Sequence, residues 1–429
     1  MILFDSNYFT YQSNELYCES TQIKKIIEET KTPVYIYSKK FFTDRVEELN
    51  EAFSEIKHKI FFSAKSNYNI NTIKIFHNLG CGIDVNSEGE IFRATKAGVE
   101  GKDMIFSGVG KTKEDIEAAL KIGIHMIKVE SFQELELINE IASQKNLVAN
   151  IAIRVNPDVD PQTHPYISTG LAKNKFGISS SQVLEIFQKG KEMKNINFVG
   201  IDMHLGSQIK NSGPFVDGVE KLVELVNKLK NQFGISLSHL DIGGGIGVSY
   251  EPSEPHLNAK TIISDLVPIF KKVDCEIYIE PGRFLTANGG ILATQVLFTK
   301  KNDMQKNFVI VDAAMTDLIR PSLYKSYHHI QPVDLYESET YVADIVGPVC
   351  ESGDFLALQR EISKCKSGDY LAVFSSGAYG MVMSSNYNGR RRPPEVFVDG
   401  NQFFIGRSRE SFDYLIFDEK IQEKLHQKK

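Results

Sequence analysis

Five residues of types that can do chemistry stand within or directly after short apolar runs: Lys65, Asp84, Arg154, His204 and Glu280. A lysine amine can form an imine with an aldehyde, and a carboxylate can hold a proton on a ring nitrogen. Partial burial is expected to lower the pKa of Lys65 and so make its amine nucleophilic. Together these residues indicate the chemistry of a bound aldehyde cofactor.

The segment Asp241-Ile-Gly-Gly-Gly-Ile-Gly247 contains three consecutive glycines, Gly243, Gly244 and Gly245. Bare backbone N–H groups can turn around an anion such as a phosphate. The spacing is not that of a dinucleotide fingerprint, and the segment follows the seventh apolar run instead of the first. Two interpretations stay open: a phosphate cradle for a smaller cofactor, with a hydroxyl from Ser207, and a plain tight turn.

Structural roles explain several of these residues as well. A lysine after a strand is commonly a solvated surface residue, and a histidine in an apolar stretch is commonly part of the core. The turn Glu280-Pro-Gly-Arg283 is as compatible with a structural ion pair as with a carboxylate that serves a cofactor ring. The choice depends on whether the fold brings these residues to one place.

Eight short apolar runs alternate with stretches of helical periodicity, which predicts parallel strands covered by helices and a closed (β/α)8 barrel. The runs are Ile60–Ala64, Gly82–Val85, Met104–Ser107, His125–Val129, Asn150–Val155, Phe198–His204, His239–Ile242 and Glu276–Glu280. Such barrels place their sites where strands end, and the polar residues above fall at those ends. The predicted barrel therefore implies that these polar side chains lie close together at one end of the barrel.

The sequence after Glu280 reads mainly as strands, and so does Met1–Tyr11. The predicted strands after Glu280 are Gly282–Lys300, Phe308–Asp312, Tyr341–Val346, Tyr370–Phe374 and Glu395–Ile405. We expect an α/β protein of two domains: a (β/α)8 barrel over 34–280, and a β-rich, barrel-like domain formed by 1–33 and 281–429. Loops of the second domain contain Arg320, Tyr324 and a cysteine, Cys350, which shares its loop with Glu351 and Asp354. Cys350 is a candidate proton donor.

The composition favours small-molecule chemistry. With 429 residues, 42% hydrophobic residues and a net charge of -6, the chain offers no electrostatic case for binding nucleic acid or an anionic membrane. No apolar run approaches the ~18 residues of a spanning helix, and the sequence start lacks a basic leader, so we expect a cytoplasmic location. Five scattered cysteines argue against a disulfide framework and a zinc site, and no metal is expected.

The residues resemble a known family, the alanine-racemase-like fold type III pyridoxal enzymes, and within it the diaminopimelate decarboxylase branch. The resemblance spans nearly the whole chain, and eight motifs follow one another in family order. They are Phe62–Asn67, Gly82–Glu90, His164–Gly177, His204–Gln208, Asp241–Gly247, Glu280–Arg283, Cys350–Asp354 and Gly377–Gly380. The patterns Ile319–Tyr324 and Ser384–Asn388 mark this branch and are generally missing from ornithine and arginine decarboxylases of the same fold.

The resemblance implies a pyridoxal-phosphate enzyme that converts meso-2,6-diaminopimelate to L-lysine and CO2, the last step of lysine biosynthesis. Lys65 would hold the cofactor as a Schiff base, Glu280 would pair with its ring nitrogen, and His204 would stack on the ring. The implied cofactor-binding set is Lys65, Asp84, Arg154, His204, Ser207, Gly243, Gly244, Gly245, Glu280, Gly282, Arg283 and Tyr379. The implied substrate-binding set is Arg283, Arg320, Tyr324, Glu351 and Tyr379.

The resemblance also implies that Cys350 is the proton donor and reaches the site from a second subunit, so that a homodimer shares its active sites. Two alternatives stay open. One is a decarboxylase of the same fold that acts on ornithine, arginine or a carboxylated polyamine. The other is a non-catalytic regulatory homologue that binds the cofactor without turnover.

Overall fold

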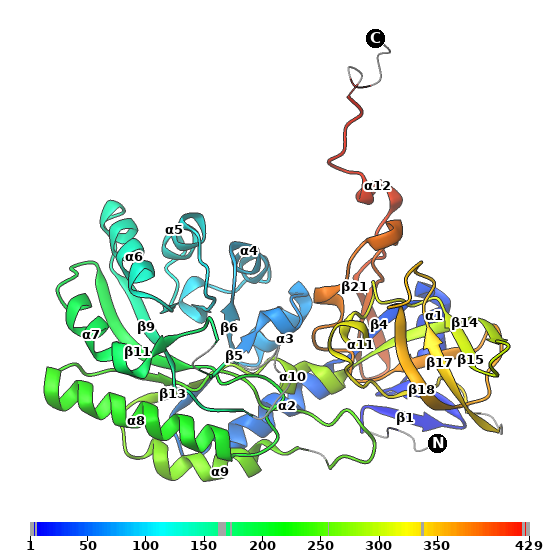
Figure 1. Ribbon diagram of the computed structural model, residues 1–429, viewed down its shortest axis with the longest axis horizontal. Helices are drawn as coiled ribbons and strands as arrows, with labels where there is room; N and C mark the ends of the chain where they lie inside the picture. Colours follow the sequence, from blue (N-terminus) through cyan, green and yellow to red (C-terminus); the bar gives the residue numbers. More distant parts are fainter. Residues whose placement is uncertain are drawn as a thin grey trace.

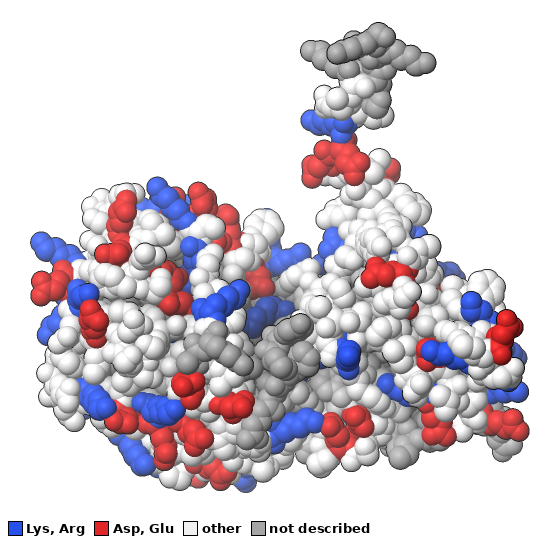
Figure 2. Space-filling model, in the orientation of Figure 1, with Lys and Arg blue, Asp and Glu red and all other residues white. Residues whose placement is uncertain are grey.

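The computed structural model describes residues 4, 7–161, 169–171, 174–255, 257–335, 339–422 and 425. A helix-covered barrel lies beside a body made mostly of strands, and the last described residues lead away from that second body (Figure 1). On the face drawn in Figure 2, side chains of both charges are interspersed over both bodies. None of the described helices is long and apolar enough to cross a bilayer.

Eight parallel strands close into a ring, because β13 pairs with β5 and β8 pairs with β9. Each of the eight predicted runs overlaps one of these strands, which confirms the predicted (β/α)8 barrel. The strands are β5 (His58–Ser63), β6 (Gly82–Val85), β7 (Met104–Phe106), β8 (Met126–Val129), β9 (Ala149–Asn156), β11 (Ile196–Met203), β12 (His239–Asp241) and β13 (Glu276–Ile279).

Eight helices alternate with the barrel strands and cover the ring (Figure 1). Polar caps define where several of them begin: the Ser87 and Ser131 hydroxyls accept backbone N–H bonds, and Thr112 forms a capping box with Asp115. The helices are α2 (Lys39–Ala52), α3 (Ile70–Asn78), α4 (Glu88–Lys96), α5 (Lys113–Lys121), α6 (Phe132–Gln144), α7 (Ser180–Gly190), α8 (Gly213–Phe233) and α9 (Ala259–Phe270).

The second body is built on a sheet of nine strands within the described residues. Its strands are β4 (Val34–Ser38), β14 (Gly290–Lys301), β15 (Asn307–Val311), β16 (Ile330–Pro332), β17 (Thr340–Val346), β18 (Phe355–Ser363), β19 (Tyr370–Val373), β20 (Glu395–Asp399) and β21 (Gln402–Arg407). The division at residue 34 placed β4 with the barrel. Instead β4 pairs with β14 and β20, because the eight barrel strands already pair in a closed ring and leave no free edge for it.

The N-terminal segment forms a small antiparallel sheet of β1 (Phe9–Gln12), β2 (Glu15–Cys18) and β3 (Thr21–Gln22), followed by α1 (Ile23–Thr30). It packs on the second body, where the Leu16 N–H donates to the Val333 carbonyl at 2.8 Å. Of the predicted strand Met1–Tyr11, residues 1–3, 5 and 6 lie outside the described part.

Two further predictions in the second body were inexact. The predicted strand Gly282–Lys300 starts with α10 (Arg283–Thr286) and becomes a strand only at Gly290. The predicted strand Glu395–Ile405 is two strands joined by a turn at Gly400. Strands β16 and β18 were not predicted. The remaining elements are β10 (Ile178–Ser179), α11 (Arg320–Tyr324) and α12 (Phe412–Leu415).

Candidate active site

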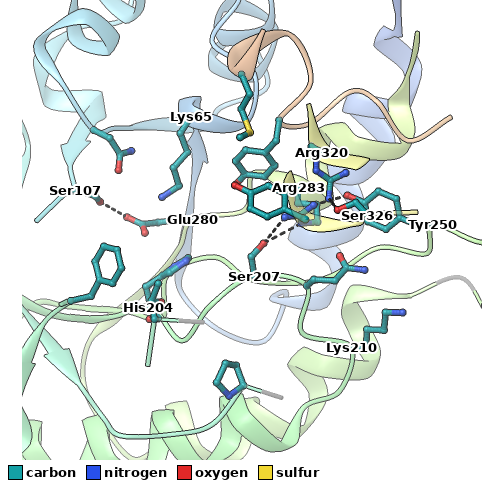
Figure 3. A pocket seen from close by; sticks show the side chains of 18 of the residues that line it. Lys65, Ser107, His204, Ser207, Lys210, Tyr250, Glu280, Arg283, Arg320 and Ser326 are labelled. Carbon is teal, nitrogen blue, oxygen red and sulfur yellow. Dashed lines mark hydrogen bonds between the residues drawn. The ribbon is translucent and has the colours of Figure 1, made fainter. Parts of the chain in front are cut away.

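A cavity of about 760 Å³ opens at the carboxyl ends of the barrel strands and is closed on one side by the second body. Lys65 enters it from the short 3-10 turn after β5, and Glu280 enters directly after β13. Figure 3 shows Lys65, Glu280 and His204 at one end, and Arg283, Arg320 and Tyr250 toward the other. The structure therefore brings residues from both predicted domains to one cavity.

Lys65 lies close to one buried carboxylate. Its Nζ is 3.8 Å from Asp84 Oδ2, which also accepts a hydrogen bond from Ser63 Oγ at 2.7 Å. Burial alone would lower the pKa of Lys65, but Asp84, Tyr379 and Glu280 raise it above its ordinary value. The expectation of a lowered pKa was therefore wrong for the cofactor-free protein, because it counted burial and not the carboxylate behind the amine.

The Glu280 carboxylate is held on one of its two oxygens. Oε1 contacts the Lys128 ammonium and accepts a hydrogen bond from Ser107 Oγ at 3.3 Å, whereas Oε2 has no hydrogen-bond partner in the described part of the chain. Burial, followed by the neighbouring Asp241 and Asp84 carboxylates, raises the pKa of Glu280 well above its ordinary value, and the Lys128 ammonium opposes that rise.

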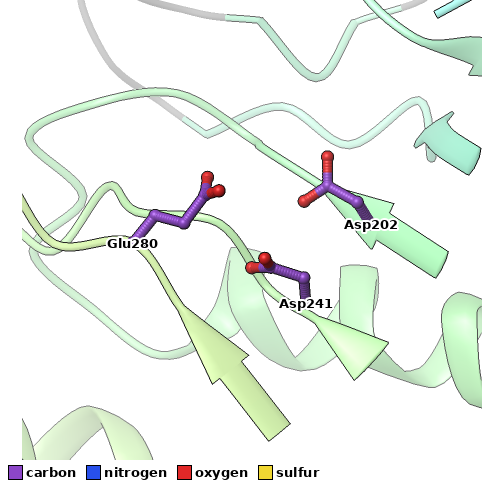
Figure 4. Close-up of side chains that lie close together, drawn as sticks. All are labelled: Asp202, Asp241 and Glu280. Carbon is purple, nitrogen blue, oxygen red and sulfur yellow. The ribbon is translucent and has the colours of Figure 1, made fainter. Parts of the chain in front are cut away.

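Three buried carboxylates, Asp202, Asp241 and Glu280, converge on one point inside the barrel (Figure 4). Their shared cation is Lys128, whose Nζ lies 2.7 Å from both Asp202 Oδ1 and Asp241 Oδ2 and also contacts Glu280. Burial raises the pKa of Asp241 to about 6 against the opposing effect of Lys128. We call these three carboxylates and Lys128 the carboxylate–lysine cluster.

His204 is neutral and has a defined tautomer. The Gly244 N–H donates to its Nδ1 at 3.1 Å, so the ring proton lies on Nε2. Burial, followed by the positive charges of Lys65, Arg154 and Lys128, lowers the pKa of His204 well below its usual value. A neutral ring that lines the cavity can stack on a flat ligand.

The glycine run permits a close approach of three loops. A Cβ on Gly244 would lie 2.2 Å from the Glu280 carbonyl oxygen, and one on Gly245, whose φ is +111°, would lie 2.6 Å from the Gly206 carbonyl oxygen. Gly243 has a φ of +68°, and a Cβ on Gly282 would meet Ser66 at 2.9 Å. Only glycine lets the loops after β11, β12 and β13 come together behind the cavity.

Two buried guanidinium groups face the cavity with uncharged partners. Arg283 donates to Ser207 Oγ from Nε at 3.1 Å and to the Tyr250 hydroxyl from Nη1 at 2.6 Å. Arg320 donates toward Ser326 Oγ at 3.3 Å and lies 2.9 Å from His328 Nε2. No ion pair joins either guanidinium to a carboxylate among the described residues, so both positive charges are available to an anionic ligand.

The Tyr250 hydroxyl lies in the positive field of these two guanidinium groups. Burial alone would raise the pKa of its hydroxyl, but Arg283 and Arg320 together lower it below the ordinary value. The Arg283 guanidinium also lies 4.9 Å from the centre of the Tyr379 ring, and Tyr379 and Tyr324 line the same cavity. The end of the cavity away from Lys65 is therefore strongly cationic and bounded by aromatic rings.

Arg154 lines the cavity but has a charged partner. Its Nη1 donates to Glu130 Oε1 at 2.6 Å, and its Nε lies 3.9 Å from Asp202 Oδ2. Asp84 supports Lys65 from behind. The part of the His164–Gly177 motif that covers 164–168, 172 and 173 lies outside the described residues.

The structure does not bring Cys350 and Glu351 to this cavity. Both are exposed and lie in the loop after β17, where the Cys350 N–H donates to Asn388 Oδ1 at 3.1 Å. The other predicted polar side chains reach the cavity or its immediate support. One copy of the chain therefore provides the amine, the Glu280 carboxylate and the arginines at this cavity, but not the predicted proton donor.

Several contributors were missed from the sequence. Lys128, Asp202 and Asp241 are charged residues inside predicted strands, and that signal was available, since a charge within an apolar barrel strand points into the interior or demands a partner. Tyr250 had no comparable signal, because it lies in a loop after the glycine run and is positioned by Arg283.

The cavity suits pyridoxal phosphate. The Lys65 amine and the Glu280 carboxylate both line it, and one carboxylate oxygen has no partner among the described residues. A cofactor with an aldehyde and a ring nitrogen requires these two groups. The glycines of the adjoining loops leave no room for a side chain where the loops that carry His204 and Glu280 meet. These are observations on the chain's own atoms, and they agree with the chemistry of that cofactor.

Comparison with known proteins settles the family. Residues 40–287 match the model of the pyridoxal-dependent decarboxylases, pyridoxal binding domain. The diaminopimelate decarboxylase of Aquifex aeolicus is 44% identical over 409 residues, which cover 95% of this chain and 96% of that protein. The chain belongs to the diaminopimelate decarboxylase family. Membership confirms the predicted enzyme class, a pyridoxal-phosphate-dependent carboxy-lyase, and the predicted cofactor.

Solved structures of this family have the same fold. The Helicobacter pylori diaminopimelate decarboxylase complexed with L-lysine matches with a TM-score of 0.88 and 38% identity over 92% of this chain and 98% of that one. The M. jannaschii diaminopimelate decarboxylase in co-complex with L-lysine matches with a TM-score of 0.93 and 33% identity over 98% and 99%. The two-body architecture is thus a property of the family.

Proposed function

We propose that this chain decarboxylates meso-2,6-diaminopimelate to L-lysine and CO2, the last step of lysine biosynthesis. The observation that carries the proposal is the pair Arg283 and Arg320, two buried guanidiniums without a carboxylate partner in the described chain. They lie at the opposite end of the cavity from Lys65 (Figure 3). A substrate with an amino-carboxylate at both ends suits an amine site at one end and a cationic site at the other.

The same pair gives the selectivity. Arginine stays protonated at neutral pH even though burial lowers the pKa of Arg320. An uncompensated buried charge costs roughly 3 to 5 kcal/mol, so a ligand that leaves these groups unpaired binds poorly. Ornithine would bring an ammonium group without a carboxylate to this end, and the two guanidiniums would repel it.

The cofactor-holding residues follow from the cavity. Lys65 would hold pyridoxal phosphate covalently, Glu280 Oε2 would face its ring nitrogen, and His204 would lie against its ring. Ser207, Gly245 and the backbone of Gly282 and Arg283 would hold its phosphate, with Gly243 and Gly244 shaping the loop and Asp84 and Arg154 supporting the ring side. When bound, the cofactor supplies an electron sink for the pair left on Cα as CO2 departs.

Each group of residues around the cavity would then have a separate role in the reaction. Lys65 provides the amine that the substrate amine displaces and that releases the product. Glu280 keeps a proton on the ring nitrogen, and Arg283, Arg320, Tyr324 and Tyr379 orient the non-reacting end of the substrate. Holding that end fixes which carboxylate leaves, because the reacting Cα is then presented in one orientation.

Cys350 and Glu351 complete the proposal through a second copy of the chain. Both are exposed and outside their own subunit's cavity. We place them in the partner's cavity, where the Cys350 thiol would protonate Cα and Glu351 would pair with the distal ammonium of the substrate. The homodimer is thus part of the proposal, and the cytoplasmic location expected from the sequence stays a prediction beside it.

The test is CO2 release by purified, cofactor-loaded protein offered meso-diaminopimelate, L-ornithine, L-arginine or L-lysine separately. We expect release with meso-diaminopimelate alone, in step with L-lysine formation, and none from Lys65→Ala. Release only with another amino acid would overturn the substrate while keeping the chemistry. Silence with all four from loaded protein would favour the non-catalytic alternative.

A further inference from the structure

Lys128 is a buried charge that the proposed reaction leaves without a role. It lies in β8, its side chain is 1% exposed, and its Nζ contacts the carboxylates of Asp202, Asp241 and Glu280. These three come from β11, β12 and the end of β13, so four strands direct charges into one point of the barrel interior. A barrel interior is ordinarily filled with branched apolar side chains.

The contact with Glu280 is specific to one oxygen. Lys128 and Ser107 both engage Oε1, and in the described chain Oε2 has no hydrogen-bond partner. Two donors on the same oxygen fix the rotation of the carboxylate. Because Glu280 lines the cavity, the arrangement leaves Oε2 to a ligand in it.

The charge balance depends on Lys128 as well. Three carboxylates share one ammonium, and the next charges around the cluster are Arg154, with Nε 3.9 Å from Asp202, and the Asp84 and Lys65 pair. Without Lys128, three carboxylates would face one another in a medium of low polarity. Glu280 would then take up a proton, because neutralisation costs less than an uncompensated buried charge.

We propose that Lys128 is a positioning residue for Glu280, which holds Oε1 and keeps the carboxylate ionised so that Oε2 can keep a proton on the cofactor's ring nitrogen. The inference rests on the proposed cofactor site and deepens it. It predicts that Lys128 acts on where one proton resides, and not only on how well the barrel folds.

The test measures directly whether the cofactor's ring nitrogen is protonated. Full-length protein is loaded with pyridoxal phosphate carrying ¹⁵N in the ring, and the ¹⁵N chemical shift is measured at neutral pH. Wild type should show a protonated ring nitrogen. Lys128→Met should move the resonance toward the unprotonated position, because a protonated Glu280 donates to the nitrogen instead of accepting from it. Lys128→Gln, which keeps an N–H donor without the charge, should move it in the same direction.

Two further variants separate charge from structure. Lys59→Met removes another lysine of a barrel strand, which pairs with Asp103 at 3.1 Å and has no ion pair with the cluster among the described residues, and it should leave the resonance unchanged. The double variant Lys128→Met/Asp202→Asn loses one positive and one negative charge, so the net charge of the cluster is that of wild type. Its resonance should therefore return toward the wild-type position. A wild-type resonance in both loaded Lys128 variants, or an equal shift in Lys59→Met, would overturn the proposal.

A second readout does not depend on the cofactor. In cofactor-free protein, infrared difference spectra should show a stronger carboxylic-acid C=O band at neutral pH in Lys128→Met or Lys128→Gln than in wild type. If the protein neither binds the cofactor nor releases CO2, the proposed function fails, while this band still decides whether Lys128 sets the charge of the cluster. An unchanged band in both variants would overturn that part.

Discussion

Arg320 is the side chain on which substrate choice should depend most, since its guanidinium is buried with only uncharged partners. We expect Arg320→Met to lower kcat/KM for meso-diaminopimelate by about 10- to 100-fold, mainly through KM, because a charge-assisted hydrogen bond contributes ~1.5 to 3 kcal/mol. Steady-state kinetics check this. The neighbouring Arg360, which donates to the His328 carbonyl at 2.7 Å and does not line the cavity, gives the control Arg360→Met. Equal losses in both variants would contradict the assignment.

Asp241 should make the folded cofactor-free protein less stable as pH rises through its titration. Its pKa is raised from 3.8 to about 6, so between about pH 4 and 6 the folded state binds more protons than the unfolded state. The contribution of Asp241 to the free energy of unfolding is therefore fully present below about pH 4. It is lost as the pH rises toward 6, by about 3 kcal/mol at most. Asp241→Asn should flatten this part of the urea-unfolding profile. An unchanged slope would show that Asp241 is ionised throughout.

The residues that could be predicted are those with distinctive types at strand ends. Lys65, His204, Glu280 and Arg283 all line the cavity, as the barrel pattern indicated. The pKa of Lys65 could not be predicted, because its direction depends on a carboxylate 3.8 Å away from a different strand. Pairing across strands, which also positions Lys128, is a property of register and not of spacing along the chain.

At the scale of elements, the loop after β12 is the most tightly constrained. A Cβ on Gly244 would lie 2.2 Å from the Glu280 carbonyl, so we expect Gly244→Ala to push apart the loops that carry His204 and Glu280. The expected loss is about 1 to 3 kcal/mol of unfolding free energy, with weaker cofactor binding. Urea unfolding and a cofactor titration measure both. Gly110→Ala, where no atom lies within 4 Å of the new Cβ, is the matched control and should change neither.

Strands buried on both faces were the easiest elements to predict, and they were also the easiest to assign to the wrong sheet. The eight barrel runs were found because helices separate them. Strand β4 has the same buried, apolar character and the same following helix, so nothing local distinguishes it from a barrel strand. Strand β18 was missed because its burial is mixed, with exposed residues at Leu358, Gln359 and Glu361.

At the scale of the whole molecule, the exposed Cys350 makes a quantitative prediction about shared sites. Lys65→Ala and Cys350→Ala should each be nearly inactive alone. Mixed and re-associated in equal amounts, they should recover about one quarter of wild-type activity, because half of the dimers are mixed and each has one intact site. Activity after co-expression with two affinity tags checks this. No recovery in isolated mixed dimers would place Cys350 outside the partner's site.

The position of β4 has a consequence for how the chain is made. This strand is synthesised among the first forty residues, yet its two neighbours, β14 and β20, start at Gly290 and Glu395. On the ribosome, β4 therefore emerges long before either of its partners, while the barrel between them can already close. Its backbone N–H and C=O groups lack both partners until β14 is made, and one edge stays unpaired until β20 follows near the end of synthesis, which makes the nascent chain a natural client for chaperones that shield such strands.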